Sequence, residues 1–153
     1  MDKNTSNEIK FINFFNKKNN TCFKRYKNKF NTFDAIDNEQ KILLEIKFRN
    51  INHYVYDSAL LGINKLIRFK KKYLNLGYKF YFACCFNDAW LLYEFNLKDE
   101  ILFKTKSIQP SKLKITEHEY IHCKDDFIKD YFCVPLKLFK TIRKRKPICL
   151  IED

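Results

Sequence analysis

The sequence predicts an α/β domain in which a central mixed β-sheet is covered by helices on both faces. Residues 32–49 contain two alternating runs around a polar centre, which is the pattern of a β-hairpin. Residues 78–86 are almost continuously apolar, as expected for a central strand buried on both faces. Amphipathic helical patterns precede and follow the hairpin, at about residues 6–18 and 56–74.

The first helix begins after a stretch that resembles a capping box, Thr5-Ser6-Asn7-Glu8, in which Thr5 would reach the third helical residue. Asn19-Asn20 ends this helix, and residues 21–29 are expected to form an irregular strand. The apolar stripe that should pack on the sheet consists of Ile9, Phe11, Ile12, Phe14 and Phe15.

The loop length of the hairpin decides which side chains share a face. A two-residue loop at Glu39-Gln40 pairs Asp34 with Glu45 and puts Lys47 one step along the same face. A three-residue loop would bring Asp37 to that face instead. We favour the two-residue loop, because an aspartate beside a turn has an ordinary explanation and because the opposite face is then apolar. That face consists of Phe33, Ala35, Leu44, Ile46 and Phe48.

The second helix is expected to end at Gly77, and the strands at about 78–86 and 90–96 follow it, joined at Asn87-Asp88. Its buried stripe should consist of Tyr56, Ala59, Leu60, Ile63, Leu66 and Ile67.

The last third of the chain gives weaker patterns. Strands are expected at about 100–108, 119–123 and 129–134. Pro135 suits the first turn of a short helix through Ile142.

Two carboxylates facing each other across a hairpin, about 5 Å apart between Cβ atoms, cost stability unless a cation lies between them. Magnesium is held by one or two carboxylates and keeps several waters for substrate phosphate. Such an ion polarises a phosphoryl oxygen and lowers the pKa of a bound water, while a nearby lysine offsets negative charge. Asp34, Glu45 and Lys47 therefore indicate a site for metal-assisted phosphodiester hydrolysis.

Asp34 followed by Glu45-Ile46-Lys47 resembles the D…(D/E)xK signature of the PD-(D/E)XK nuclease superfamily, which includes restriction endonucleases and Holliday-junction resolvases. The proline that often precedes the first aspartate is absent, and Phe33 stands in its place. The resemblance extends to the order of elements over about residues 7–96, since a helix precedes the hairpin and a basic helix follows it.

This resemblance implies a restriction-endonuclease-like fold with three catalytic residues, Asp34, Glu45 and Lys47. Asp34, Glu45 and the backbone carbonyl of Ile46 would bind Mg²⁺, for which Mn²⁺ could substitute. Lys47 would orient or activate the attacking water.

Further residues are implied by the same resemblance. In several members the first helix supplies an additional acidic ligand, and Glu8 is the acid available here, although a first-turn glutamate also suits the helix dipole. A helix after the motif often lends a basic or amide side chain to the site. Lys65 is the candidate, with Ser58 and Gly62 on its face, and a solvated helix lysine is the alternative.

Lys and Arg number 30 against 18 Asp and Glu, which gives a formal charge of +12 and indicates a polyanionic partner. Nucleic acid is the leading candidate, although AT-rich coding could also produce a lysine-rich chain. The candidate contacts are Lys24, Arg25, Lys27, Arg49, Arg68, Lys71, Lys72, Arg143, Lys144, Arg145 and Lys146. Several of these could equally be solvated surface or edge-strand lysines, and the C-terminal cluster could be a nuclear address.

These observations favour a magnesium-dependent nuclease, most readily a DNA endonuclease. A non-catalytic nucleic-acid-binding protein on the same fold and an RNA-directed nuclease are the alternatives. The form of the substrate and a homodimeric state are left open by the sequence.

The six cysteines include no CxxC pair, and no apolar segment opens the chain, so we expect reduced thiols in an intracellular protein of the cytoplasm or nucleus. No run approaches the ~20 apolar residues of a membrane span, so a soluble protein without membrane contact is expected. The length favours a single nuclease-like domain over residues 1–153, with its core at about 7–96 and a C-terminal elaboration at about 97–153.

Overall fold

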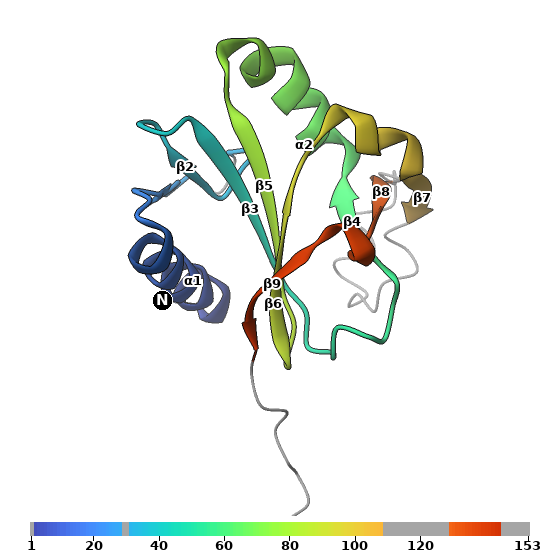
Figure 1. The fold of residues 1–153 in the computed structure, drawn as a ribbon, viewed down its shortest axis with the longest axis horizontal. Coiled ribbons are helices and arrows are strands. Elements are labelled where there is room, and N and C mark those ends of the chain that lie inside the picture. The colour runs from blue at the N-terminus through green and yellow to red at the C-terminus, as the bar shows by residue number, and fades with distance from the viewer. Residues whose placement is uncertain (1, 29–30, 109–128, 145–153) are drawn as a thin grey trace, which may run out of the picture.

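The computed structural model describes residues 2–28, 31–108 and 129–144. Within these residues, six strands form one sheet in the order β1-β2-β3-β5-β6-β9, and three form a second sheet in the order β4-β8-β7 (Figure 1). β3 and β5 are parallel whereas their other neighbours are antiparallel, so the predicted mixed sheet of an α/β protein is confirmed. The strands are β1 Lys24–Arg25, β2 Ala35–Asp37, β3 Ile42–Phe48, β4 Ser58–Gly62, β5 Lys79–Cys85, β6 Ala89–Glu94, β7 Lys104–Ile108, β8 Lys129–Pro135 and β9 Lys140–Lys144.

Helices cover both faces of the larger sheet, as predicted. α1, Lys3–Asn19, packs on one face, and α2, Ile63–Arg68, packs on the other (Figure 1). α2 continues as the π-helix Phe69–Tyr73 and the 3-10 helix Leu74–Leu76, which ends at Gly77 with φ 83°, as expected for a left-handed helix stop. Two further 3-10 helices in the described residues are η3, Leu97–Leu102, and η5, Leu136–Leu138.

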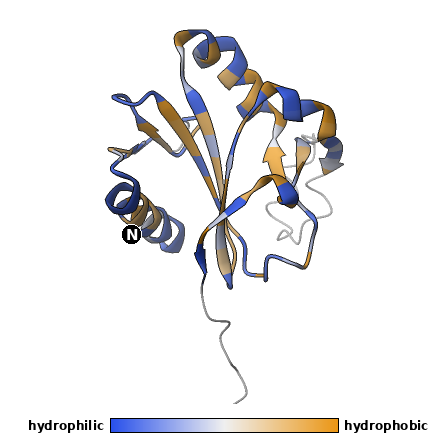
Figure 2. Cartoon of the chain, in the orientation of Figure 1, coloured by the Kyte–Doolittle hydropathy of each residue, from blue (hydrophilic) through white to orange (hydrophobic). Residues whose placement is uncertain are grey.

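The central strands β3 and β5 carry hydrophobic segments (Figure 2). Both strands are buried on both faces because their side chains alternate between two apolar clusters. Ala35 and Leu44 pack with α1 in one cluster, and Leu43 and Phe80 pack with α2 in the other. The predicted stripe of α1 supplies three fully packed side chains, which are Phe11, Ile12 and Phe15.

The predicted hairpin register is confirmed. Ala35 pairs with Leu44 and Asp37 with Ile42, which is the register of the two-residue-loop alternative. Asp37 is fully buried and accepts backbone N–H bonds from Glu39 and Gln40 at Oδ1 and from Cys22 at Oδ2. It therefore stabilises the turn and lies away from Glu45.

One member of the predicted apolar face is misplaced. Phe33 packs against Phe80 and Tyr73 in the α2 cluster, not with Ala35 on the α1 side. Strand geometry begins only at Ala35, so the alternation does not extend back to Phe33.

The start of α1 also differs from the prediction. The cap is Asp2, whose side chain accepts a hydrogen bond from the Thr5 N–H at 2.7 Å, and the helix begins at Lys3. The irregular strand expected over residues 21–29 is reduced to the two paired residues of β1.

The helix predicted over residues 56–74 is wrong in its first half. Ser58–Gly62 is strand β4, paired with β8, and the helix begins only at Ile63. Two side chains of the predicted buried stripe are exposed: Tyr56 at 66%, before β4, and Ile67 at 54%, on the outer side of α2. Apolar residues in this stretch satisfy both strand and helix periods, and the β8 partner lies some seventy residues along the chain.

The C-terminal predictions are correct in part. The strand at 129–134 is confirmed as β8, but the helix expected from Pro135 to Ile142 is η5 followed by strand β9, which pairs with β6. The first residues of the strand expected at 100–108 belong to η3. The strand predicted at 119–123 lies outside the described residues. Among the described helices, none combines the length and apolar character needed to cross a bilayer.

Candidate active site

Asp34 and Glu45 come together because the hairpin register is the predicted one. Glu45 lies in the middle of β3 between β2 and β5, and is 1% exposed. Asp34 immediately precedes β2, where its N–H donates to the Leu44 carbonyl at 3.0 Å. Its Oδ2 accepts the Ile46 N–H at 2.7 Å. The backbone on either side of Glu45 thus holds the second carboxylate of the pair.

The Asp34 carboxyl is electrostatically unfavourable as an anion. Burial and, second, the charge of Glu45 raise its pKa to about 7, against the smaller opposing effects of the Ile46 N–H and the Lys65 ammonium. A carboxyl of this kind holds a proton near neutral pH unless another cation is supplied. This is the behaviour expected of a position that binds a metal ion after releasing a proton.

Two lysines from different elements approach the two oxygens of Glu45. Lys47 Nζ, from the same strand, lies 3.1 Å from Oε2, and Lys65 Nζ, from α2, lies 3.2 Å from Oε1. Lys65 also donates to the Thr32 carbonyl. Glu45 Oε1 is buried and accepts no hydrogen bond, despite its ion-pair partner at 3.2 Å. The predicted supporting lysine is therefore brought to the acidic pair, and one buried carboxylate oxygen keeps acceptor capacity.

Glu8 lies on the second turn of α1, where it is half-buried. The expectation that it is a first-turn glutamate suited to the helix dipole is wrong, because α1 begins at Lys3 and its first turn carries no acidic residue. Its carboxylate is 3.9 Å from the Arg25 guanidinium, and burial raises its pKa. Its charge also raises the pKa of Asp34, so it belongs to the same electrostatic environment. Within the described part of the chain, however, no three His, Cys, Asp or Glu side chains form a group that could hold a metal ion.

The residues therefore fit a metal with few protein ligands. Asp34 and Glu45 offer hard carboxylate oxygens, which suit Mg²⁺ that keeps several of its waters. Ile46 contacts Asp34 through its N–H, and its carbonyl as a metal ligand stays a prediction. Glu8 lies 3.9 Å from the Arg25 guanidinium, and its role as a metal ligand stays a prediction.

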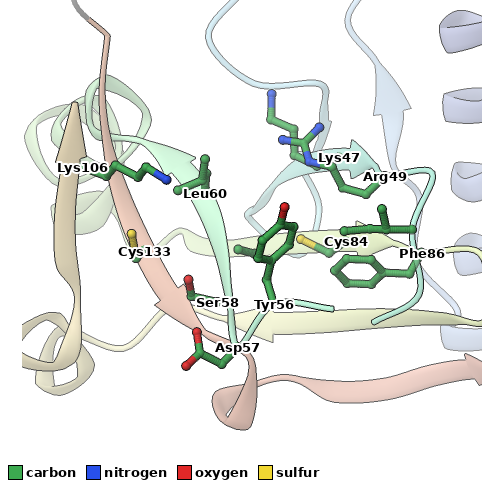
Figure 3. A pocket seen from close by; sticks show the side chains of 12 residues that line it. Lys47, Arg49, Tyr56, Asp57, Ser58, Leu60, Cys84, Phe86, Lys106 and Cys133 are labelled. Atoms are coloured by element: carbon green, nitrogen blue, oxygen red, sulfur yellow. The ribbon is translucent and has the colours of Figure 1, made fainter. Parts of the chain in front are cut away.

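Two hollows of the described surface meet at Lys47. We name the first the lysine cleft: it has a volume of about 610 Å³ and is lined by residues that include Lys47, Asn64, Lys65, Lys129 and Tyr131. We name the second the tyrosine pocket: it has a volume of about 300 Å³ (Figure 3). Its lining includes Lys47, Arg49, Tyr56, Leu60, Phe86 and Lys106. The ammonium group that pairs with Glu45 therefore borders both hollows.

The predicted nucleic-acid contacts are distributed over several faces. Arg49 is exposed and borders both the tyrosine pocket and a further hollow of about 560 Å³, which also contains Arg143. Arg143 stacks over the Trp90 ring at 4.7 Å. Arg25 is part-buried beside Glu8. The remaining predicted contacts in the described residues are exposed, namely Lys24, Lys27, Arg68, Lys71, Lys72 and Lys144, whereas Arg145 and Lys146 lie outside the described residues.

Sequence reasoning missed the residues that shape the hollows. Tyr56 was expected in a helix stripe, and Lys106, Lys129 and Tyr131 had no assigned role, because the second sheet that carries three of them was not predicted. Two tyrosines, Tyr54 and Tyr56, lie a few residues after Arg49 at the end of the motif strand, and they are a local signal that could have indicated a surface loop.

Comparison of the chain with protein-family models, with curated proteins and with solved structures found no match.

Proposed function

We propose that this protein is a divalent-metal-dependent nuclease that hydrolyses phosphodiester bonds, most readily in DNA, on a restriction-endonuclease-like fold. The observation that carries the proposal is the acidic pair of part-buried Asp34 and buried Glu45, whose ion-pair partner Lys47 borders two hollows of the surface. A carboxyl with a pKa near 7 beside a buried carboxylate is costly as architecture, and binding a cation would remove the cost.

The residues would divide the work as follows. Asp34, once deprotonated, and Glu45 would hold Mg²⁺ or Mn²⁺, which supplies charge neutralisation at the phosphoryl oxygen and a bound water of lowered pKa. Lys47, whose ammonium lies 3.1 Å from Glu45 Oε2, would orient the attacking water and offset charge on the phosphate. Lys65 holds Glu45 from the opposite side while anchored to the Thr32 carbonyl.

The order of elements supports the proposed fold type. A helix, α1, precedes the motif hairpin, and a basic helix, α2 with its continuation, follows it. β4 separates the hairpin from α2 and belongs to the second sheet, which the resemblance did not lead us to expect. The formal charge of +12 supports a nucleic-acid substrate, because neutralising phosphates releases counterions.

A second candidate, a non-catalytic nucleic-acid-binding protein, is favoured by one observation. Glu45 already has two ammonium partners, which can neutralise it without a metal, and the described residues contain no three-ligand group. In that case the acidic pair is a buried ion-pair network and only the basic surface is functional.

One experiment separates the candidates. The protein is incubated with supercoiled, linear and branched DNA and with RNA, in EDTA, in Mg²⁺ and in Mn²⁺, beside a Glu45→Gln control prepared identically. Cleavage that needs the metal and disappears in the control supports the nuclease, and the preferred polymer distinguishes DNA from RNA. Binding without cleavage in either metal supports the second candidate.

A further inference from the structure

The tyrosine pocket combines three kinds of lining on one small concave surface (Figure 3). Leu60, Cys84 and Phe86 form an apolar wall, and cations come from two regions: Lys47 and Arg49 from the end of β3, and Lys106 from β7. Asp57 is the acidic residue of the lining, so cations outnumber carboxylates there. Ligand sites commonly have this composition, an apolar wall with a few placed polar groups, at volumes from about 300 Å³ upwards.

Tyr56 projects into this pocket while remaining 66% exposed. In Figure 3 its ring stands between strand β4 and the side chains of Lys47 and Arg49. A single exposed aromatic residue is ordinary, but this one borders an apolar wall and a basic rim together. An aromatic ring in that position can stack with a flat ligand that also carries negative charge.

The loop that carries Tyr56 is held at both ends. On one side, His53 donates its N–H to Asp88 Oδ1 at 2.9 Å, its ring Nδ1 lies 2.6 Å from Asp88 Oδ2, and Asn87 donates its N–H to the Ile51 carbonyl. On the other side, Leu136 donates its N–H to the Asp57 carbonyl at 2.8 Å. A ring anchored in this way loses less conformational freedom when it binds a ligand.

The pocket is also connected to the proposed chemistry through Lys47, which borders it and lies 3.1 Å from Glu45. A flat, anionic polymer unit fits all of these features: its base would lie on Tyr56 and the apolar wall, with its phosphates on Lys47, Arg49 and Lys106. In a duplex the bases are paired and stacked inside the helix, so only an unpaired or extruded base could enter a concave pocket.

We propose that the tyrosine pocket binds the base of an unpaired nucleotide next to the phosphate that Lys47 contacts, so that the substrate is single-stranded or carries a single-stranded segment. The claim that the cleaved substrate is single-stranded rests on the proposed function. The claim that the pocket binds an unpaired base can be tested without catalysis. The occupant is a nucleotide within a nucleic-acid strand, bound through base stacking as well as charge.

The test measures binding in EDTA, so that no cleavage occurs. Fluorescence anisotropy is recorded with a labelled single-stranded DNA of about 12 nucleotides, within the span of typical single-strand sites, and with a blunt duplex of the same length. Three variants are compared with the wild type: Tyr56→Ala, Tyr56→Phe, and Tyr54→Ala as the matched control. Tyr54 is 71% exposed on the same loop and is not among the pocket-lining residues.

Tyr56→Ala should weaken single-strand binding about 5- to 150-fold, the range expected for loss of one stacked base, and should change duplex binding less than about twofold. Tyr56→Phe should bind single strands as the wild type does, because the ring stacks on the base and the hydroxyl is not needed for stacking. Tyr54→Ala should resemble the wild type.

Equal losses on both polymers, or no loss with Tyr56→Ala, would overturn the pocket assignment while leaving the nuclease proposal intact. Selective loss of single-strand binding in a protein that never cleaves with Mg²⁺ or Mn²⁺ would support the pocket and overturn the nuclease. Thermal unfolding of each variant, expected to match the wild type since Tyr56 is largely exposed, separates lost binding from lost folding.

Discussion

Lys65 Nζ lies 3.2 Å from Glu45 Oε1, although the two residues belong to α2 and β3 and are twenty positions apart. The same ammonium donates to the Thr32 carbonyl, just before Asp34 in the chain. Lys65 therefore ties the helix to both halves of the motif hairpin. Its positive charge also lowers the pKa of Asp34, against the larger effects that raise it.

Substitution of Lys65 should impair turnover more than binding. Lys65→Ala removes a cation beside the acidic pair, so we expect kcat to fall by at least about tenfold while the Kd for DNA changes by less than about threefold. Because Lys65 lowers the pKa of Asp34, the acidic limb of the pH–rate profile should also move to higher pH. Single-turnover cleavage and anisotropy measure the two quantities.

Lys71→Ala is the matched control, because Lys71 is an exposed lysine on the continuation of the same helix. It should weaken binding slightly and leave kcat and the pH profile unchanged. Small, equal effects of both substitutions would assign Lys65 to general surface charge.

The stability of metal-free protein should depend on pH through Asp34. Its folded-state pKa of about 7 lies above the unfolded value of about 3.9, so the folded state binds the extra proton between these values. The contribution of the protonated carboxyl to the free energy of unfolding is complete below about pH 4 and is lost as pH rises to about 7. The total loss is up to about 4 kcal/mol. Asp34→Asn removes the titrating carboxyl, so the variant should not lose this stability as pH rises.

The difference in Tm between Asp34→Asn and wild type, measured in EDTA, should therefore grow in favour of the variant between pH 4 and 7 and then stay constant. Added Mg²⁺ should raise the wild-type Tm above pH 7 and leave the variant unaffected. A Tm difference independent of pH would contradict the raised pKa.

The centre of the fold was predictable because local and tertiary preferences agree there. Alternation in residues 34–48 and the turn chemistry of Asp37 select one register, and burial of β5 on both faces follows from its continuous apolar run. That register alone was enough to place Asp34 near Glu45. The Lys65 contact followed from the resemblance to a nuclease family rather than from residue spacing.

The second sheet was not predictable because its strands find partners far along the chain. β4 pairs Leu61 with Phe132, and a five-residue strand next to a helix gives no distinct period of its own. β9, in the larger sheet, was missed for another reason: it is exposed along most of its length, so its sequence lacks the apolar alternation of a buried strand. The tyrosine pocket is formed partly by this second sheet, and for that reason its lining was missed as well.

Binding of nucleic acid should weaken steeply with salt. Each phosphate contact contributes a log–log slope of about −0.9 on duplex DNA and about −0.7 on single strands. Arg49 borders two hollows, so Arg49→Ala should lower the magnitude of the slope by about one contact, as measured by anisotropy between low and physiological salt. A binding constant that barely changes with salt would show that the +12 charge does not face nucleic acid.

Substitutions of the two hairpin aspartates should have opposite effects on activity and stability. Asp34→Asn should abolish magnesium-dependent cleavage, as should Glu45→Gln and Lys47→Ala, and binding by the Asp34→Asn and Glu45→Gln variants should stay within about threefold of wild type. At pH 7.5 in EDTA, Asp34→Asn should also raise Tm, because it removes a carboxylate from a buried acidic pair.

Asp37→Asn should lower stability and leave cleavage activity intact. The fully buried Asp37 carboxylate accepts three backbone N–H bonds with its two oxygens, and an amide cannot accept them all. We expect a loss of about 1–3 kcal/mol in unfolding free energy, and normal cleavage per folded molecule below the lowered Tm. Activity lost in Asp37→Asn but kept in Asp34→Asn would mean that the metal site uses the other aspartate, and would refute the assignment of Asp34.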